Sequence, residues 1–368
     1  MALTTVRPQG MGFNTGRRNM VINGAMQVAQ RGTSHTDFQN NGAYTLDRFA
    51  YRRSGTISST TFDVTQENTS GLPEFPKCIQ IQVKDAAMSD PNTPASARNE
   101  IKYTFEGQDL QHLQYGTATA QAVTVSFYVK SSVAGTYSWY WEVHDSEDSY
   151  IAEYTISSAD TWEYKTITVP APTTSQVDTA IPNDNTTGLK MGWTGYGNVT
   201  GTSDHRTSTT GWQAAPSGTQ PIYTDNQANA FSTLDNTFSL TGIQVELGEN
   251  ASDFEHRSFT EELKLCHRYY MHIGSGRHMA ARGASGGSLC AFSVPLGAPL
   301  RASPTMTITG SARAFKYNNY SDSSNVPTVG TNGFDEDTYF LYLAQGGHSI
   351  DDDRVATWQG NIQVDAEL

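Results

Sequence analysis

Apolar and polar residues alternate along much of the chain, with the period of two that is typical of half-buried strands. The clearest case joins residues 123–130 to residues 137–143 through a short connection, and both flanks keep one apolar face. Two such runs across a short loop predict an antiparallel hairpin. The same alternation recurs at 78–83, 164–169 and 238–247. Gly242 interrupts the last run, which predicts a β-bulge.

Helical periodicity is convincing in one segment only. Ser258 followed by Glu261 forms a capping-box pattern, in which each side chain caps a free backbone N–H. Leu263, Cys266 and Tyr270 then fall on one helical face. The sequence therefore predicts a helix over about 259–272. Beyond it, apolar runs predict further strands at 289–296, 305–309, 338–343 and 355–364.

Strands at short spacing with one helix predict an all-β protein. We expect a jelly-roll β-sandwich, followed by one short helix and a smaller C-terminal β-sandwich domain. The expected divisions are an extended arm at 1–18, the jelly roll at 19–256, a linking helix at 257–275 and the C-terminal domain at 276–368. The polar stretch at 171–236 is interpreted as loops on a rigid sheet, because it carries several aromatic residues.

The composition is polar but weakly charged, with 17% charged and 11% aromatic residues. A disordered chain would have more charge and fewer aromatics. The net charge of −13 disfavours binding to nucleic acid or to an anionic membrane. Residues 1–60 are nevertheless basic, with seven Arg against two Asp. This segment could dock on an acidic neighbour through Arg7, Arg17 and Arg18, or it could simply be a solvated basic start.

The three cysteines, at 78, 266 and 290, have no CxxC spacing and imply no disulfide framework. A reducing compartment is therefore expected for folding. Residues 1–20 lack the apolar core of a secretory signal, and no apolar run reaches the ~18 residues that a membrane span requires. We expect assembly in the cytoplasm of a host cell and no membrane insertion.

Several blocks of sequence resemble, in order, a jelly-roll module found in phage and prophage tail proteins. The block NMVINGAMQVAQRG at 19–32, followed by YTLDRF at 44–49, resembles its opening, and VSFYVKSS at 125–132 its middle. LTGIQVELG at 240–248 and FEHRS at 254–258 resemble its close, and EELKLCHRYY at 261–270 the helix that follows. Residues 294–305, containing LRASPT, resemble the first strands of the next domain.

This resemblance implies a structural protein of the virion tail, such as a tail fibre or receptor-binding protein. It implies contact with a host-surface glycan, other tail proteins as partners and a homotrimer, since several weak sites presented together give usable affinity. Carbohydrate-binding jelly rolls with calcium tend to have acidic residues near their first and last strands. Here Gln27 and Gln244 stand there and only Glu246 is acidic, so no metal or other cofactor is expected.

A glycan site needs aromatic platforms for the apolar faces of sugar rings, beside polar groups for the hydroxyls. Trp139 and Trp141 share the apolar face of their run, so both are assigned to the core. The predicted glycan-binding residues are Tyr140 on the opposite face and, within the polar stretch, Trp193, Tyr196 and Trp212.

Catalytic alternatives find less support in the sequence. Residues 283–287 fit G-x-S-x-G, but a nucleophile elbow needs a strand before the serine and a helix after it. Acidic runs at 145–148, 335–337 and 351–353 could supply paired carboxylates for glycan cleavage, or could be solvated loops. Histidines at 256, 267, 272 and 278 lack the convergent spacing of metal ligands. We therefore predict no enzyme, with a glycan depolymerase and a capsid or baseplate subunit as alternatives.

Overall fold

The computed structural model describes most of residues 17–367. The residues not described are 1–16, 39–41, 55–59, 86–96, 145, 200–204, 215–220, 275–277, 285–288, 297, 317–318, 321–327, 330–339, 347–354 and 368. The described part is all-β apart from two short helices, which confirms the predicted fold class. None of its helices is long and apolar enough to cross a membrane.

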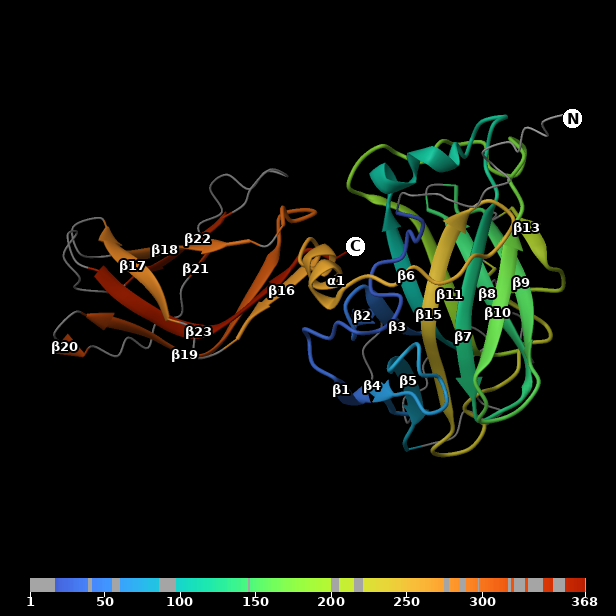
Figure 1. Ribbon diagram of the computed structural model, residues 1–368, viewed down its shortest axis with the longest axis horizontal. Coiled ribbons are helices and arrows are strands. Elements are labelled where there is room, and N and C mark those ends of the chain that lie inside the picture. Colours follow the sequence, from blue (N-terminus) through green and yellow to red (C-terminus); the bar gives the residue numbers. More distant parts are fainter. Residues whose placement is uncertain are drawn as a thin grey trace, which may run out of the picture.

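Two antiparallel sheets face each other and form a jelly-roll sandwich (Figure 1). Sheet A has the order β1 (Ser34–Phe38), β4 (Phe62–Asn68), β5 (Lys77–Val83), β15 (Thr237–Leu247), β7 (Val123–Ser131) and β10 (Glu163–Val169). Sheet B has the order β13 (Gly211–Gln213), β9 (Ser149–Ile156), β8 (Gly135–Val143), β11 (Thr187–Gly197), β6 (Arg98–Glu106), β3 (Phe49–Ser54) and β2 (Ala43–Tyr44). A short parallel pair, β12 (Arg206–Thr207) and β14 (Tyr223–Thr224), completes it.

The core lies between the two sheets and is rich in aromatic side chains. Trp139, Trp141 and Trp193 point inward from β8 and β11 and are fully buried. The edge of Trp193 meets Phe127 of sheet A, with ring centroids 5.5 Å apart. The assignment of Trp139 and Trp141 to the core is therefore confirmed, because the alternation in β8 sets which side chains face sheet A.

The predicted hairpin at 123–143 is corrected by the structure. Both strands exist, but β7 belongs to sheet A and β8 to sheet B, so they are not hydrogen-bonded neighbours. The chain crosses between the sheets at 132–134, and the two apolar faces meet across the core. Alternation identifies an apolar face, but it does not distinguish a strand beside it from a strand opposite it. The bulge predicted at Gly242 is confirmed by a register shift between Thr241 and Gln244.

The helix α1 (Phe259–Cys266) starts as predicted but ends six residues earlier. The side chain of Ser258 accepts a hydrogen bond from the backbone N–H of Glu261, as the capping pattern requires. Tyr270–Ile273 forms a strand, β16, which pairs with the last strand of the chain. The predicted extension to residue 272 is wrong because strand pairing outweighs the helical periodicity there.

A 3-10 helix, η2 (Gly107–Leu113), was not predicted from the sequence. Its three buried residues, Gly107, Leu110 and Leu113, follow the i, i+3 spacing of such a turn. The polar stretch at 171–236 also contains a strand that was interpreted as loop. This is β11, a central strand of sheet B, in which Leu189, Met191 and Trp193 alternate inward.

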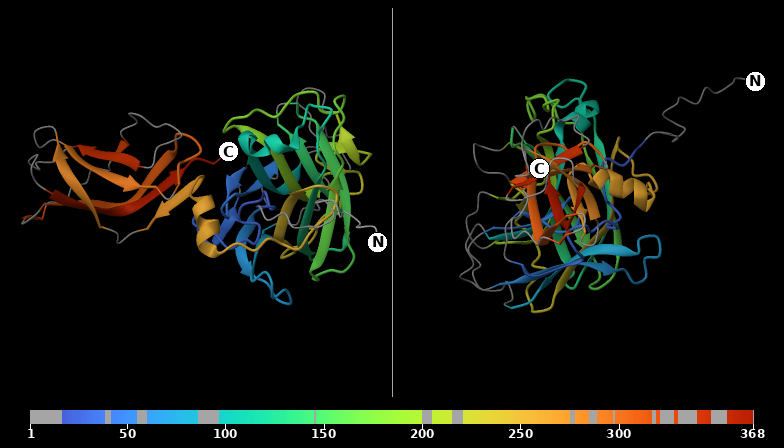
Figure 2. Two further views of the ribbon diagram at one scale, coloured as in Figure 1. Left: turned by 45° about the horizontal axis from the view of Figure 1, so that its top comes forward. Right: turned by 90° about the vertical axis from the view of Figure 1, so that its left-hand side faces the viewer.

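The C-terminal strands form one eight-stranded, strongly curved sheet (Figures 1 and 2). Its order is β20 (Asn319–Tyr320), β19 (Thr305–Lys316), β23 (Val355–Asp365), β17 (His278–Ala284), β18 (Leu289–Pro295), β22 (Phe340–Gly346) and β21 (Thr328–Val329), with β16 also on β23. The G-x-S-x-G match begins with Gly283 and Ala284, the last two residues of β17, and β17 pairs antiparallel with β18. A strand therefore follows the motif in place of the helix that a nucleophile elbow needs, and Ser285 itself is outside the described residues.

The end of the chain returns to the jelly roll and is fixed there by charge. The carboxylate of Glu367, just after β23, is buried and pairs with the guanidinium groups of Arg48 and Arg31. Arg48 also stacks on the ring of Tyr269, 3.4 Å from its centroid. Arg301 donates hydrogen bonds to the backbone carbonyls of Ala366, Glu367 and Asn185. Buried ion pairs with further hydrogen bonds resist separation, because breaking one leaves an uncompensated charge.

Candidate functional site

Three of the four predicted glycan platforms are buried in the chain itself. Trp193 is fully buried in the core, and Tyr196, also in β11, is 7% exposed. Both were assigned to loops, and their place in a central strand leaves the ring of Trp193 no solvent-facing surface and that of Tyr196 very little. Tyr140 is 1% exposed. Their predicted role as exposed platforms is therefore wrong for this chain.

Tyr140 does lie on the outer face of sheet B, as its place in the alternation predicts. It is covered there by a small cluster formed with Ile151, Ile222 and Tyr223. Its ring lies across Gly192, where an added Cβ would come within 2.4 Å of the ring. The segment that carries β14 folds over the outer face, and this tertiary contact is not encoded in the alternation.

Trp212 is the one predicted platform that keeps part of its surface exposed. It lies in the edge strand β13, and its indole N–H donates to the carbonyl of Pro170 at 3.1 Å. Its ring contacts Tyr150 and Tyr115 edge-on, at 5.7 and 6.1 Å between centroids. Trp212 therefore serves mainly to close the edge of the sandwich.

The arginines predicted to attach the chain to the virion are engaged within the chain where they are described. Arg17 pairs with Glu261 of α1 at 3.0 Å. Arg18 donates to the hydroxyl of Ser252 at 2.9 Å. Arg7 lies outside the described residues. Attachment through these three residues stays a prediction.

The residues considered for metal binding are not gathered into one site. Within the described residues, no group of three or more His, Cys, Asp or Glu side chains could hold a metal ion. Glu246 instead accepts hydrogen bonds from the backbone N–H and the hydroxyl of Ser252, at 2.8 and 2.6 Å. Gln244 donates to the same carboxylate at 3.0 Å. Hydrogen-bond donors of the protein thus satisfy Glu246, the one acidic side chain at the position considered for calcium.

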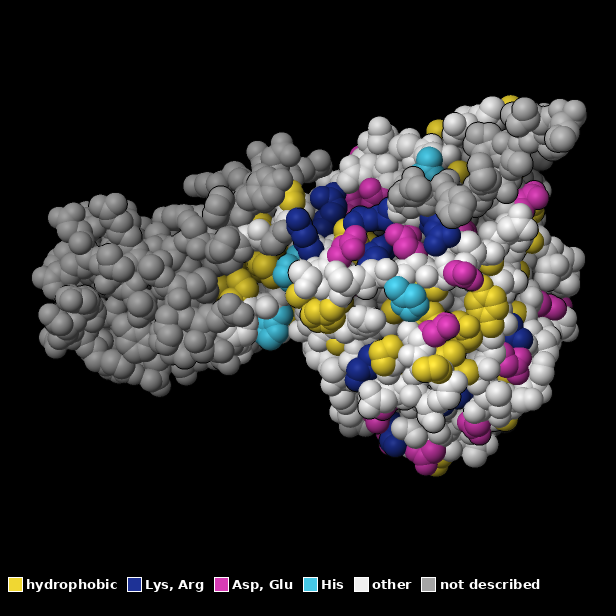
Figure 3. All heavy atoms as spheres, in the orientation of Figure 1, with side chains coloured by type: hydrophobic (Ala, Val, Ile, Leu, Met, Phe, Trp, Pro, Cys, Tyr) yellow, Lys and Arg dark blue, Asp and Glu magenta, His cyan; other side chains and the backbone are white. Residues whose placement is uncertain are grey.

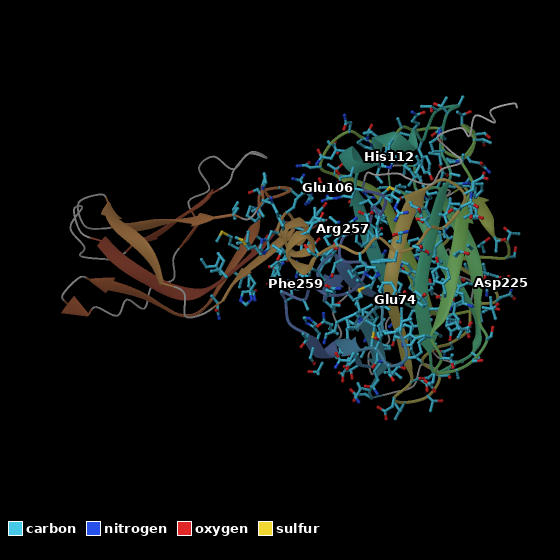
Figure 4. The ribbon with its side chains drawn as sticks, viewed as in Figure 1. Glu74, Glu106, His112, Asp225, Arg257 and Phe259 are labelled. Atoms are coloured by element: carbon cyan, nitrogen blue, oxygen red, sulfur yellow. The ribbon has the colours of Figure 1, made fainter. Side chains whose placement is uncertain are left out.

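A cavity of about 880 Å³ lies where α1, η2, β6 and β15 meet. Glu106, His112 and Arg257 mark its surroundings in Figure 4. Several of its charged groups neutralise each other, since Arg268 makes two hydrogen bonds to Glu106, at 2.7 and 2.8 Å. Burial alone would raise the pKa of Glu106, but these bonds hold it below its usual value. The cavity is thus lined by structural ion pairs of the junction.

A continuous row of aromatic rings crosses the outer face of sheet A. This aromatic strip consists of Tyr164, Tyr128, Phe75, Phe254 and His256. Ring centroids are 5.1 Å apart from Tyr164 to Tyr128 and 5.3 Å from Tyr128 to Phe75. Phe75 then meets Phe254 at 4.8 Å and stacks on His256 at 5.3 Å. Such spacings are typical of favourable ring–ring contacts.

The strip is built from positions far apart in sequence. Tyr128 of β7 and Tyr164 of β10 are directly paired across sheet A. Phe75 comes from the turn before β5, and it lies over the bulge at Gly242. Gly242 has a positive φ of 61°, and a Cβ there would be 2.9 Å from the Phe75 ring. A glycine is therefore required for Phe75 to join Tyr128 over β15.

The strip is partly open to solvent and is flanked by polar groups. Tyr164 is 47% exposed and His256 is also exposed. Hydrophobic side chains gather over β15, β7 and β10 on this face in Figure 3, and Glu74 lies in front of β15 in Figure 4. Burial and then the Glu74 carboxylate raise the pKa of Tyr128 above its usual value, so its hydroxyl stays a neutral hydrogen-bond donor. Ring faces beside such donors and acceptors suit a sugar.

No protein-family model matches this chain, and no curated protein matches it. Among solved structures, it is similar to the enzymatically active domain of tailspike protein 4 of bacteriophage CBA120, with 11% identity and a TM-score of 0.31. That match covers 62% of this chain but only 21% of the tailspike chain. It is also similar to a family 11 carbohydrate-binding module from Clostridium thermocellum in complex with a mixed-linked tetrasaccharide, with 11% identity and a TM-score of 0.27. That match covers 61% of this chain and 97% of the module. The CBM22-1 xylan-binding domain of Paenibacillus barcinonensis Xyn10C has 11% identity to this chain and a TM-score of 0.27. That match covers 64% of this chain and 100% of the xylan-binding domain.

Proposed function

We propose that this chain is a non-catalytic structural protein of a bacteriophage tail, a fibre or receptor-binding protein that contacts glycan on the host surface. The aromatic strip on sheet A is the observation that carries the glycan part of this proposal. The resemblance of the ordered sequence blocks to phage tail modules supports the location. In the proposed assembly the chain works as a homotrimer beside other tail proteins.

The strip would bind glycan by stacking and by hydrogen bonds at its edge. The apolar face of a sugar packs on the Tyr164 ring, and the hydroxyls of the sugar reach the Tyr128 hydroxyl and the Glu74 carboxylate. One such contact is weak, so several copies held together would supply the avidity. No bond needs to be broken for this role, and purified host polysaccharide should keep its chain length when incubated with the protein.

Tyr164→Ala should weaken glycan binding about fivefold, since one ring contact contributes about 1 kcal/mol. The measurement is binding of the purified chain to an array of bacterial surface polysaccharides, followed by titration of each polysaccharide that binds. Leu234→Ala is the matched control, because Leu234 has nearly the same exposure, 46%, and lies outside the strip.

An unchanged affinity in Tyr164→Ala would remove the strip from the proposal. Equal losses in Tyr164→Ala and Leu234→Ala would point to a general surface effect. Thermal unfolding of both variants should match that of the parent, because neither side chain is part of the core.

Antibodies to residues 276–368 should label the periphery of the tail in immunogold electron microscopy of intact virions. This is expected because a receptor-binding chain must present one end to the host. Label over the head would favour the capsid alternative. Absence of label from every virion, with the antibody shown to bind the purified chain, would contradict the virion location.

A further inference from the structure

The outer face of sheet B carries a group of charged side chains that the proposed glycan strip does not use. Lys102 of β6 is paired with Gly192 of β11, which is paired in turn with Tyr140 of β8. Glu100 is paired with Arg52 of β3. Because side chains alternate along a strand, Arg98, Glu100 and Lys102 of β6 point to the same face.

Two members of this group are buried without the hydrogen bonds that they require. Glu100 is 0% exposed, and among the described residues neither of its carboxylate oxygens has a hydrogen-bond partner. Arg98 is 3% exposed, and its Nε and one Nη have no acceptor within the part of the chain that the structure describes. The nearest cations to Glu100 are the Nε atoms of Arg52, at 3.6 Å, and Arg98, at 3.8 Å. Both distances are too long for hydrogen bonds.

The group also has an excess of positive charge. It contains four cations, Arg52, Arg98, Lys102 and Lys190, and two carboxylates, Glu100 and Glu142. Glu142 is already satisfied by the Lys190 ammonium at 2.6 Å. Burial lowers the pKa of Lys102. The Glu100 carboxylate opposes this shift, and the positive charges of Lys190 and Arg52 add to it. An anion beside Lys102 and Arg52 would favour the charged form of the Lys102 amine and would offset this local excess of cations.

We propose that the outer face of sheet B is a second saccharide site, which takes a sugar bearing a carboxylate. The carboxylate of the sugar accepts hydrogen bonds from Lys102 and Arg52. Its hydroxyls, which both donate and accept, supply the donors that Glu100 lacks and the acceptors that Arg98 lacks. The Arg52 side chain beside Glu100 is 31% exposed, so its rotation opens a path to the buried pair.

This site goes beyond the proposed function, because it lies on the sheet opposite the aromatic strip and specifies an acidic ligand. A neutral sugar could satisfy the hydroxyl partners, but it would leave the cations without an anion. An inorganic anion could satisfy the cations, but it would leave Glu100 without a donor. The combination of unpartnered acceptors and donors therefore selects an acidic saccharide.

The experiment is calorimetric titration of the full chain with three acidic oligosaccharides, trigalacturonate, trimannuronate and an α2,8-linked sialic acid trimer. Neutral galactotriose and sodium sulfate are titrated in parallel. At least one acidic trimer should bind about tenfold more tightly than galactotriose, because Lys102 and Arg52 favour a charged ligand. It should also bind about tenfold more tightly than sulfate, because sulfate has no hydroxyl to donate to Glu100. The difference should shrink at high salt.

Lys102→Met should reduce binding of that trimer at least about fivefold and leave galactotriose binding unchanged. Lys84→Met is the matched control, since Lys84 follows β5 of sheet A and pairs with the exposed Asp235 just before β15. Thermal unfolding of both variants shows whether the fold is kept. If Lys102→Met fails to fold, Arg52→Gln, at a more exposed position, gives the same test.

Binding that is equal for acidic and neutral trimers, or absent for all three acidic trimers, would overturn the second site. Sulfate binding as tight as that of the best trimer would reduce it to a simple anion site and would also overturn it. Tyr164→Ala separates the two proposals, because it should leave acidic binding intact. Loss of acidic binding in Tyr164→Ala but not in Lys102→Met would leave the aromatic strip as the glycan site and remove the one on sheet B.

Discussion

Arg48→Met should lower the free energy of unfolding by about 3–5 kcal/mol, the usual cost of removing one partner of a buried ion pair. Arg48 is 1% exposed and pairs with Glu367, whose side chain is 3% exposed. Methionine would keep the backbone N–H of residue 48 as a donor to that carboxylate, but would leave Arg31, 3.5 Å away, as its one cationic partner among the described residues. It would also remove the guanidinium from the Tyr269 ring. Urea unfolding of the purified chain, followed by tryptophan fluorescence, measures the loss.

A double variant distinguishes whether the loss of stability in Arg48→Met comes from the unpaired charge or from lost packing. Arg48→Met combined with Glu367→Leu should recover much of the stability, because removing both charges leaves no unpaired group. Arg17→Met provides the control, since the Arg17–Glu261 pair is about half exposed and such pairs contribute about 0–1 kcal/mol. Equal losses for Arg48→Met and Arg17→Met would contradict the view that Glu367 anchors the end of the chain.

Trp193→Ala should destabilise the jelly roll by about 3–5 kcal/mol, as large-to-small changes in a packed core do. Trp193 is fully buried at the centre of sheet B, paired with Ile101 on one side and with Trp139 on the other. Its removal leaves a void between the sheets beside Phe127. The loss appears as a lower urea midpoint, with the slope of the transition retained.

Trp212→Ala separates a core role from a surface role. Trp212 lies in the edge strand β13 and is only partly buried, so its loss should cost clearly less than that of Trp193. If Trp193→Ala instead kept full stability and lost glycan binding, the proposed role of Trp193 in the core would be contradicted. Its predicted role as a glycan-binding residue would then be supported.

Alternation was a reliable guide to which face of a strand is apolar, and an incomplete guide to what lies opposite it. Leu189, Met191 and Trp193 alternate as clearly as the residues of β8, yet the glycine- and threonine-rich surroundings led to a loop interpretation of β11. Tyr128 and Tyr140 are aromatic residues at positions that the alternation assigns to the polar face of their strands. Such a position is the one sequence signal for an exposed ring. The same signal has two outcomes: Tyr128 joins the aromatic strip, and Tyr140 is covered by Tyr223.

By itself, the sequence determined the all-β class, the inward-facing residues of β7 and β8, the bulge at Gly242 and the start of α1 at Ser258. These features depend on local alternation, backbone freedom and capping, which are properties of neighbouring residues. Only the tertiary structure decided the pairing of β7 and β8 with different sheets, the burial of Tyr140, the aromatic strip and the return of Glu367 to Arg48. Each of these depends on contacts between segments far apart in the chain, and their energy comes from burial that no local pattern specifies.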